Sequence, residues 1–310
     1  MGMTLRFTFA GILAPTLFLS GCAMDSTSEP IVVAGIPFDD TQNVEESYEI
    51  FMDLVADATG REVEFYQASD YATVTEALLS GQVDIAQISA FSYILASSRS
   101  DDLDILGISG RNPTDPPGYF SYAIKRAGDT ALNSIEDLRG KTICFSDPSS
   151  GAGYLWPAKY LAEAGINPDP LVTEDIKAVF AETFPQVALS VALGDCDAGF
   201  LLDVFWDRTL VDSDLVDISQ LEKFWESNVS PGIPLVAKTS NFSEDELIAL
   251  TKMFGERANK DYLVSAGICD DRQSCNFLSA AAWGYLPGED SFYDELRDLC
   301  RELDLAQCRQ

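Results

Sequence analysis

The residues best suited to chemistry in this chain lie together at positions 140–157, which read GKTICFSDPSSGAGYLWP. The apolar residues 142–145 predict a short strand, and a helix is expected to begin near Ser149 or Ser150 after a turn of small residues. Such a turn directs several free backbone N–H groups at one point, and the helix dipole adds positive charge there. The segment therefore favours the binding of an anion, although a capped helix start without a ligand would show the same pattern.

Ser149 and Ser150 are also possible nucleophiles, which makes an exported hydrolase or transferase a rival hypothesis. The chain contains no histidine and no Gly-x-Ser-x-Gly motif, so a serine would depend on Lys141 or Lys159 as its base. A zinc site is disfavoured because Cys-x-x-Cys spacings and histidine ligands are both missing from the sequence. We therefore predict a binding protein without metal or cofactor, not an enzyme.

The first 22 residues predict export. Arg6 precedes an apolar run over residues 7–19, which is shorter than the roughly 20 residues of a membrane span and fits a secretory signal. The run ends in Leu-Ser-Gly-Cys, which resembles the lipobox of bacterial lipoproteins. That resemblance implies a signal peptide over residues 1–21, a lipidated Cys22 and a polar tether through residue 30. An uncleaved anchor with an incidental cysteine is the alternative.

The composition is that of a globular protein, but the charge is extreme. Apolar residues make up 46% of the chain and charged residues 23%, while the formal net charge is −30. Removal of residues 1–21 would take the charge to −31, because Arg6 is the one charged residue lost. So acidic a protein repels nucleic acid and anionic lipid, which argues against both as partners. Screening limits the same repulsion of a small anionic ligand to about 10 Å at 0.1 M salt.

The six cysteines other than Cys22 form an even set in an exported chain, which predicts disulfides. Many pairings are possible, and the sequence does not select one by itself. We favour three pairs: Cys144–Cys196, Cys269–Cys275 and Cys300–Cys308. The first of these would join two neighbouring strands of one lobe.

Strand-like and helix-like segments alternate along the chain, which predicts α/β units with mainly parallel sheets. Residues 75–86 (TEALLSGQVDIA) resemble residues 188–199 (ALSVALGDCDAG). Each stretch reads as a helix that ends at a glycine, followed by a strand that carries Asp84 or Asp197 near its start. The echo indicates two similar lobes, and these aspartates are expected to tie down turns at strand ends.

Several loose motifs together resemble the phosphate/phosphite/phosphonate-type substrate-binding proteins of ABC importers, over nearly the whole mature chain. The matching residues, in order, are Asp70-Tyr71 with Glu76-Ala-Leu, Gly81-x-Val-Asp-Ile-Ala86, Ser92-Tyr-Ile-Leu-Ala96, Gly118-Tyr-Phe-Ser121, Ser134-Ile-Glu-Asp-Leu-Arg-Gly-Lys141, residues 147–157, and Ser230-Pro-Gly-Ile-Pro234.

The resemblance implies a two-lobe α/β fold of the type II periplasmic binding proteins, each lobe a mainly parallel sheet flanked by helices, with two hinge crossings. Lobe I would comprise residues 31–122 and 233–310, and lobe II residues 123–232. The ligand would lie between the lobes.

The resemblance also assigns the site. The family's Ser-Thr-Ser-Gly anion loop falls on Ser150, Gly151, Ala152 and Gly153, so one of three hydroxyls is kept, the amides remain, and Ser149 is a substitute. Other residues implied at the ligand are Tyr71, Tyr93, Phe184 and Asp203. Phe184 stands where the family often has a histidine, and Asp203 lies near an acidic position used for the amino group of aminophosphonates. With Trp206, Phe184 is a candidate for an apolar section of the site, with core packing as the alternative for both.

The implied function is delivery of a small oxyanion, similar to phosphonate, phosphite or phosphate, to an ABC permease. The protein is expected to be a monomer anchored by lipid at the outer face of the cytoplasmic membrane. The alternatives are a binding protein for a carboxylate or sulfonate, and a sensory lipoprotein that uses the same fold.

Overall fold

The computed structural model describes residues 1–2, 29–36, 44–114, 117–172, 174–212, 215–277 and 282–309. The predicted cleavage site, Cys22 and nearly all of the tether lie outside these residues. Within them, no helix is both long and apolar enough to cross a membrane. The same part of the chain contains no group of three or more His, Cys, Asp or Glu residues placed to hold a metal ion.

In the described part of the chain, the strands form two large sheets and a short two-stranded ribbon. The first sheet has the order β13 (Gly284–Leu286), β4 (Leu103–Gly110), β12 (Pro234–Lys238), β3 (Ile85–Gln87), β1 (Ile31–Gly35) and β2 (Val63–Tyr66). The second has the order β10 (Leu221–Glu226), β6 (Ser121–Arg126), β9 (Ala198–Leu202), β7 (Thr142–Phe145) and β8 (Lys177–Phe180). The ribbon pairs β5 (Gly118–Tyr119) with β11 (Ser230–Pro231).

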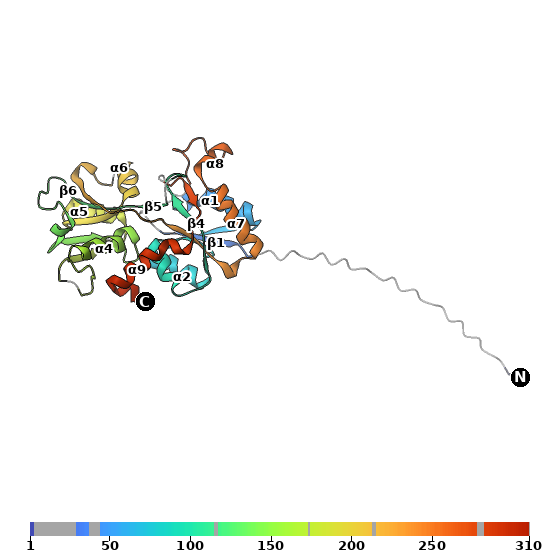
Figure 1. The fold of residues 1–310 in the computed structure, drawn as a ribbon. Helices are drawn as coiled ribbons and strands as arrows, with labels where there is room; N and C mark the ends of the chain where they lie inside the picture. Colours follow the sequence, from blue (N-terminus) through green and yellow to red (C-terminus); the bar gives the residue numbers. More distant parts are fainter. Residues whose placement is uncertain are drawn as a thin grey trace.

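Helices flank both sheets (Figure 1). Those of the first lobe are α1 (Val44–Thr59), α2 (Tyr71–Ser80), α3 (Ala90–Ser97), α7 (Glu244–Glu256), α8 (Lys260–Ser265) and α9 (Asp294–Leu303). Those of the second are α4 (Trp156–Glu163), α5 (Phe184–Leu193) and α6 (Leu210–Asp212), with two π-helical segments, η2 (Gly151–Leu155) and η3 (Phe205–Thr209). Short 3₁₀ turns are η1 (Ile135–Leu138), η4 (Ile218–Gln220), η5 (Thr239–Asn241), η6 (Asp290–Tyr293) and η7 (Ala306–Arg309).

The predicted two-lobe α/β fold is confirmed, but the sheets are mixed rather than mainly parallel. In the first sheet β1 runs parallel to β2 and β3, whereas β12 lies antiparallel between β3 and β4. In the second sheet β7 is parallel to β8 and β9, while β6 pairs antiparallel with β9 and β10. Parallel neighbours require a crossover connection. Strand β12 instead arrives directly from the ribbon between the lobes, so it enters its sheet in the opposite direction.

The described chain passes between the lobes at β5 and β11, whose pairing sets Tyr119 opposite Ser230. Helix α9 provides a further connection, because it lies between the two lobes (Figure 1). On one side Arg297 Nη2 donates to Ser97 Oγ of α3 at 3.1 Å. On the other side Glu295 accepts from Lys159 Nζ of α4 at 3.2 Å. The C-terminal helix therefore contacts both lobes.

The similarity between residues 75–86 and residues 188–199 corresponds to equivalent structure in the two lobes. Helices α2 and α5 both end at a glycine with positive φ, 79° at Gly81 and 87° at Gly194, where a side chain would be strained. The carboxylate of Asp84 accepts from the N–H of Val32 at 2.7 Å, and that of Asp197 accepts from the N–H of Thr142 at 2.9 Å. Both aspartates hold the backbone of a neighbouring strand, β1 or β7, whereas the prediction was that they tie down turns at strand ends.

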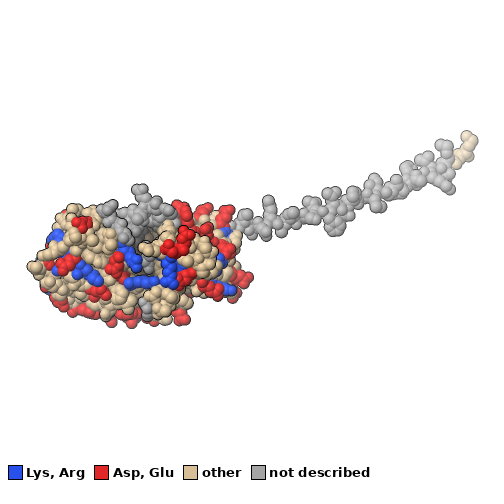
Figure 2. All heavy atoms as spheres, turned by 90° about the horizontal axis from the view of Figure 1, so that it is seen from above, with Lys and Arg blue, Asp and Glu red and all other residues tan. Residues whose placement is uncertain are grey.

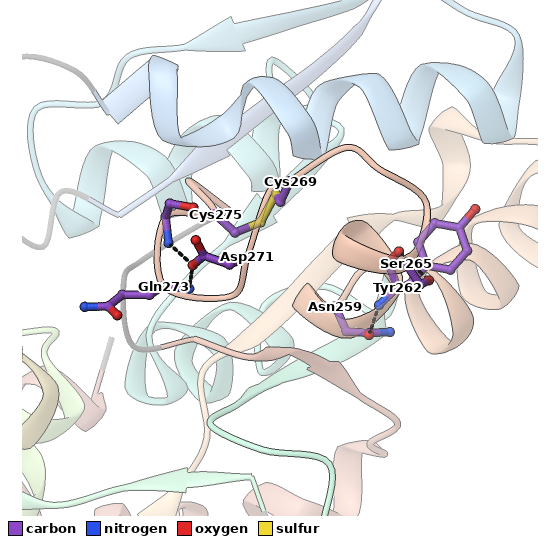
Figure 3. Close-up of a disulfide and its surroundings, with 8 residues drawn as sticks. Asn259, Tyr262, Ser265, Cys269, Asp271, Gln273 and Cys275 are labelled. Atoms are coloured by element: carbon purple, nitrogen blue, oxygen red, sulfur yellow. Dashed lines mark hydrogen bonds between the residues drawn. A yellow bond between two sulfur atoms is a disulfide. The ribbon is translucent and has the colours of Figure 1, made fainter.

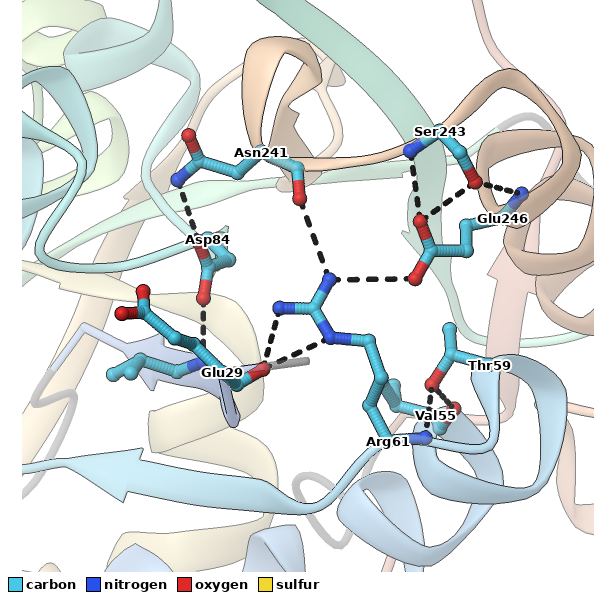
Figure 4. Close-up of polar contacts among 9 residues, drawn as sticks. Glu29, Val55, Thr59, Arg61, Asp84, Asn241, Ser243 and Glu246 are labelled. Carbon is cyan, nitrogen blue, oxygen red and sulfur yellow. Dashed lines mark hydrogen bonds and ion pairs between the residues drawn. The ribbon is translucent and has the colours of Figure 1, made fainter. Parts of the chain in front are cut away.

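Arg61 fixes the start of the described globular chain to the first lobe (Figure 4). Its guanidinium donates to the carbonyl of Glu29 at 2.7 and 3.0 Å, and to the carbonyl of Asn241 at 3.3 Å. It also pairs with Glu246, which forms the capping box of α7 with Ser243. Glu29, near the start of the described globular chain, is therefore held at a defined point on this lobe.

All three favoured disulfides are present: Cys144–Cys196, Cys269–Cys275 and Cys300–Cys308. The Cys269–Cys275 pair closes a small loop after α8 (Figure 3). Inside that loop the Asp271 carboxylate accepts from the amides of Gln273 and Ser274 at 2.7 and 2.9 Å. The Cys144–Cys196 pair ties β7 to the residues just before β9 in the core of the second lobe.

Replacing both Cys144 and Cys196 with alanine is expected to lower the free energy of unfolding by about 4 kcal/mol, because this disulfide closes a long loop. Its sequence separation is 52, against 6 for Cys269–Cys275. The double alanine variant of Cys269 and Cys275 is the matched control, with an expected loss of about 2 kcal/mol. Urea unfolding of the three proteins measures the difference, and a larger loss in the control variant would contradict the prediction.

Candidate functional site

The predicted strand, turn and helix start at residues 140–157 are present as β7, a turn and η2. Ser150 is the N-cap of η2, and its Oγ accepts from the amide of Gly153 at 3.0 Å. The first N–H groups of a helix have no intrahelical acceptor. In the described residues the amides of Gly151 and Ala152 donate to no backbone or side-chain acceptor, so they remain free to bind a ligand. π-Helical turns such as η2 occur often at functional sites.

The first lobe contacts this turn through the N-termini of α2 and α3. Ser89, the N-cap of α3, donates its hydroxyl to the carbonyl of Ser149 at 2.6 Å. Tyr71, the first residue of α2, is buried, and its phenol lies beside the Ser150 hydroxyl and the Asp147 carboxylate. Burial, and secondarily Asp147, raises the pKa of Tyr71, so the phenol stays a hydrogen-bond donor. The lobes therefore meet at the predicted anion loop.

Two glycines of the loop are required because other side chains occupy the space next to them. A Cβ at position 151 would overlap the Tyr119 hydroxyl, and a Cβ at position 153 would overlap Ser146 Oγ. Tyr119 belongs to the ribbon strand β5, and Ser146 follows the last residue of β7. Hydroxyl groups from outside the loop therefore lie directly against the loop backbone at both glycines.

Buried polar atoms without a hydrogen-bond partner gather around this loop. Five such side-chain atoms occur in the described residues, and four of them belong to Tyr119, Ser146, Asp203 and Ser230. Ser230 is paired with Tyr119 across the ribbon, and Asp203 lies near enough to Tyr119 to raise the pKa of its phenol. Buried polar groups are normally satisfied. Because several unpartnered polar atoms lie together here, the arrangement indicates a site whose hydrogen bonds a polar ligand would complete.

We call this group the interlobe site. It consists of Tyr71, Tyr119, Ser146, Ser150, Asp203 and Ser230, together with the amides of Gly151 and Ala152. Sequence reasoning missed Tyr119, Ser146 and Ser230 as site residues. Tyr119 and Ser230 lie in motifs that carry the family resemblance, but no spacing in the sequence places them against residue 151.

Asp203 directly follows β9 and has no exposed surface. Its Oδ2 forms an ion pair with Arg111, which also lies over the Phe120 ring at 5.2 Å. Burial raises the pKa of Asp203 to about 6, although Arg111 opposes the shift. Its Oδ1 has no partner among the described residues. One oxygen of this carboxylate is therefore committed to the protein and the other is available.

A second acid borders the site. Burial raises the pKa of Asp147 to about 6, with further increases from Asp70 and Glu182. The surroundings of the anion loop are thus acidic, in keeping with the net charge. Figure 2 shows acidic side chains over much of one face and basic side chains near its middle. Attraction of an anion must come from short-range donors rather than from the overall field.

The structure does not bring every predicted residue to the interlobe site. The hydroxyl of Tyr93 donates to Asp290 Oδ1 at 2.7 Å, and its ring packs on Tyr293, so it faces η6, the turn that leads into α9. Phe184 packs against Phe205 with ring centroids 5.9 Å apart, in the apolar cluster that also contains Tyr119 and Ala152. Trp206 packs against the same cluster and is partly buried.

The predicted loop residues do reach the first lobe. Ser149 contacts it through its carbonyl, and Ser150 through its side chain. Lys159, one of the two bases considered for a serine nucleophile, pairs with Glu295 and lies over the Trp156 ring at 4.6 Å.

Comparisons with known proteins identify the family and agree with the two-lobe fold. A family described as "ABC transporter, phosphonate, periplasmic substrate-binding protein" matches residues 33–267. The Phosphate-import protein PhnD of Mycolicibacterium smegmatis is 32% identical over 284 residues, which are 91% of this chain and 88% of that protein. The phosphonates-binding periplasmic protein of Escherichia coli is 25% identical over 241 residues, which are 76% of this chain and 68% of that protein. PhnD1 of Prochlorococcus marinus, solved with methylphosphonate, superposes with a TM-score of 0.72 at 17% identity, covering 89% of this chain and 99% of that one.

Proposed function

Because the chain belongs to the phosphonate family of periplasmic substrate-binding proteins of ABC transporters, we propose that it binds a small phosphorus oxyanion at the interlobe site. The family supplies an exported transport component, not an enzyme. The observation that carries the site is the concentration of unpartnered buried polar atoms around the free amides of Gly151 and Ala152. Those amides and the hydroxyls of Tyr71, Tyr119 and Ser150 would donate to the anion.

Residues 31–122 and 233–310 form lobe I, and residues 123–232 form lobe II, and the ligand holds the lobes closed until the protein docks on its permease. The protein acts as a monomer. It is attached to the outer face of the cytoplasmic membrane through lipid on Cys22, after removal of residues 1–21, and the tether leads to the point that Arg61 fixes.

Isothermal titration with phosphate, phosphite, methylphosphonate and ethylphosphonate tests the ligand class. At least one of them is expected to bind with a Kd of about 1 μM or lower, which corresponds to roughly 8 kcal/mol. The absence of binding by all four would overturn the proposed function while leaving the fold unaffected.

A serine variant tests where the anion binds. Ser150→Ala is expected to weaken binding of the preferred anion at least about tenfold, because it removes a hydroxyl next to Tyr71 and the cap that orients η2. Ser243→Ala is the matched control, since Ser243 caps α7 in the same way on the first lobe. Both variants should lose about 1 kcal/mol of stability, but Ser243→Ala should keep its affinity. Equal affinities for the two variants would place the ligand elsewhere.

A further inference from the structure

Residues 290–309, which comprise η6, α9 and η7, form a segment that we call the C-terminal strap (Figure 1). On the first lobe Arg297 Nη2 donates to Ser97 Oγ of α3 at 3.1 Å. Near the crossing between the lobes, the Tyr293 hydroxyl donates to the carbonyl of Gly232 at 2.9 Å. Gly232 directly follows β11, the return crossing from the second lobe. The strap is therefore fixed both to the first lobe and to one of the two crossings.

The same strap contacts the second lobe. Glu295 of α9 accepts from Lys159 Nζ of α4 at 3.2 Å. Gln307 Oε1 of η7 accepts from the Tyr154 hydroxyl of η2 at 3.5 Å. Leu305 has no exposed surface and belongs to the apolar cluster that contains residues of η2 and α4. The end of the chain thus joins two bodies that the other crossings connect only through β5 and β11.

A disulfide closes the end of the strap. Cys300 lies in α9 and Cys308 in η7, at a sequence separation of 8. Helix α9 ends at Asp304, which has a positive φ of 45°, so the chain changes direction there. The bond keeps the residues between the two cysteines folded against α9, and these residues include Leu305 and Gln307. The disulfide therefore holds in place the part of the strap that contacts η2.

The strap lies away from the contact that closes the interlobe site, but on the same structural elements. Helix α3 begins beside Ser89, whose Oγ donates to the carbonyl of Ser149 just before η2, at 2.6 Å. The strap contacts α3 at its last residue, Ser97, and the second lobe at Lys159, in the helix that follows η2. A rotation of the lobes that separates Ser89 from Ser149 also moves Ser97 relative to Lys159. Opening the site therefore has to break or displace contacts of the strap.

We propose that the C-terminal strap is a conformational device that holds a fraction of the ligand-free protein closed, and that it thereby sets the affinity for whichever anion enters the interlobe site. A ligand that binds the closed form has an apparent affinity proportional to the fraction of protein already closed. Loosening the strap should weaken every ligand by the same factor. The inference goes beyond the proposed function, because it concerns an equilibrium that exists without a ligand.

A charge exchange tests the contact with the second lobe. Glu295→Lys places a second cation against Lys159, and it is expected to weaken the binding of phosphate and of methylphosphonate about fivefold each. Small-angle X-ray scattering of the ligand-free variant should show a larger radius of gyration than that of the wild type. Adding Lys159→Glu restores opposite charges and should return both properties to the wild-type values. Glu302→Lys, the same charge change at an exposed position of α9, is the matched control and should alter neither.

A disulfide pair provides a second, independent test. Replacing Cys300 and Cys308 together with alanine is expected to enlarge the ligand-free protein and to weaken both anions about tenfold. The double alanine variant of Cys269 and Cys275 removes a loop of similar length from the first lobe, with a separation of 6 against 8. It should lose comparable stability but keep the wild-type scattering and affinities.

The outcomes separate this inference from the proposed function. Identical scattering of the ligand-free wild type, Glu295→Lys and the Cys300/Cys308 variant would overturn the inference. A loss confined to one of the two anions would also overturn it, because the strap would then act at the binding site itself. Failure of every phosphorus oxyanion to bind would overturn the proposed function alone, since the scattering needs no ligand. If the disulfide variant does not fold, the charge exchange decides.

Discussion

Gly151→Ala is expected to lower the affinity for the preferred phosphorus oxyanion about 100-fold, because it displaces the hydroxyl of Tyr119 in strand β5. The added Cβ would overlap the Tyr119 hydroxyl, and the ring carbon that carries it would lie 3.3 Å away. Tyr119 is buried, and its strand β5 is paired with β11, so its hydroxyl is held against the loop. The variant therefore loses a donor to a charged ligand and strains the loop whose amides bind it. Isothermal titration measures the change.

The cause can be separated from a general glycine effect. Tyr119→Phe removes the overlapping oxygen, so Gly151→Ala should have little further effect in the Tyr119→Phe background. Gly255→Ala is the matched control, because Gly255 lies in α7 with open space around it. That substitution should leave binding unchanged and stabilise the helix by about 0.5–1 kcal/mol. Additive losses in the double variant would show that Tyr119 is not the obstacle.

This steric relationship also explains the altered anion loop. The resemblance assigns two missing hydroxyls to positions 151 and 152, which suggests a weakened site when the loop is considered alone. In the folded protein the Tyr119 hydroxyl occupies the space beside residue 151. Restoring a hydroxyl there, as in Gly151→Ser, would cause the same overlap. A hydroxyl from the ribbon therefore already lies beside residue 151.

The sequence predicted the features that depend on local patterns. The strand, turn and helix start at residues 140–157, the glycines that end α2 and α5, and the aspartates after them were all readable from spacing. The favoured cysteine pairs also agree with the structure. The antiparallel direction of β12 could not be predicted from the sequence, because it depends on where the chain returns from the other lobe.

The parts of the site that were missed depend on contacts between distant segments. Tyr119 is about 30 residues from the loop that it touches, and only the pairing of β5 with β11 aligns it with Ser230. Tyr93 illustrates the opposite case. It lies in α3, one turn beyond the N-cap Ser89 that contacts the loop, and its hydroxyl points to Asp290, nearly 200 residues later. Both residues lie in motifs that the sequence shows, but the packing decides which side chains face the interlobe site.

Arg111→Ala is expected to lower the free energy of unfolding by about 3 kcal/mol at pH 8, because it leaves a fully buried carboxylate without its counter-charge. Urea unfolding at pH 8 and at pH 5, compared with the wild type at each pH, measures the loss. The conservative variant Arg111→Lys should lose less stability than Arg111→Ala, because lysine keeps the positive charge beside Asp203. It should still lose some stability, because it gives up the planar contact with Phe120.

The pH dependence distinguishes charge from packing. Asp203 has a raised pKa in the folded protein, so its ionised form destabilises the fold, and this penalty appears as the pH rises above the ordinary aspartate value of about 3.9. Without Arg111 the pKa rises further and the penalty grows. The loss caused by Arg111→Ala should therefore be small at pH 5, increase through pH 6 and be largest at pH 8. In the Asp203→Asn background it should not vary with pH. A loss of the same size at both pH values in the native background would mean that Arg111 acts through its contact with Phe120, and that Asp203 does not hold a buried charge.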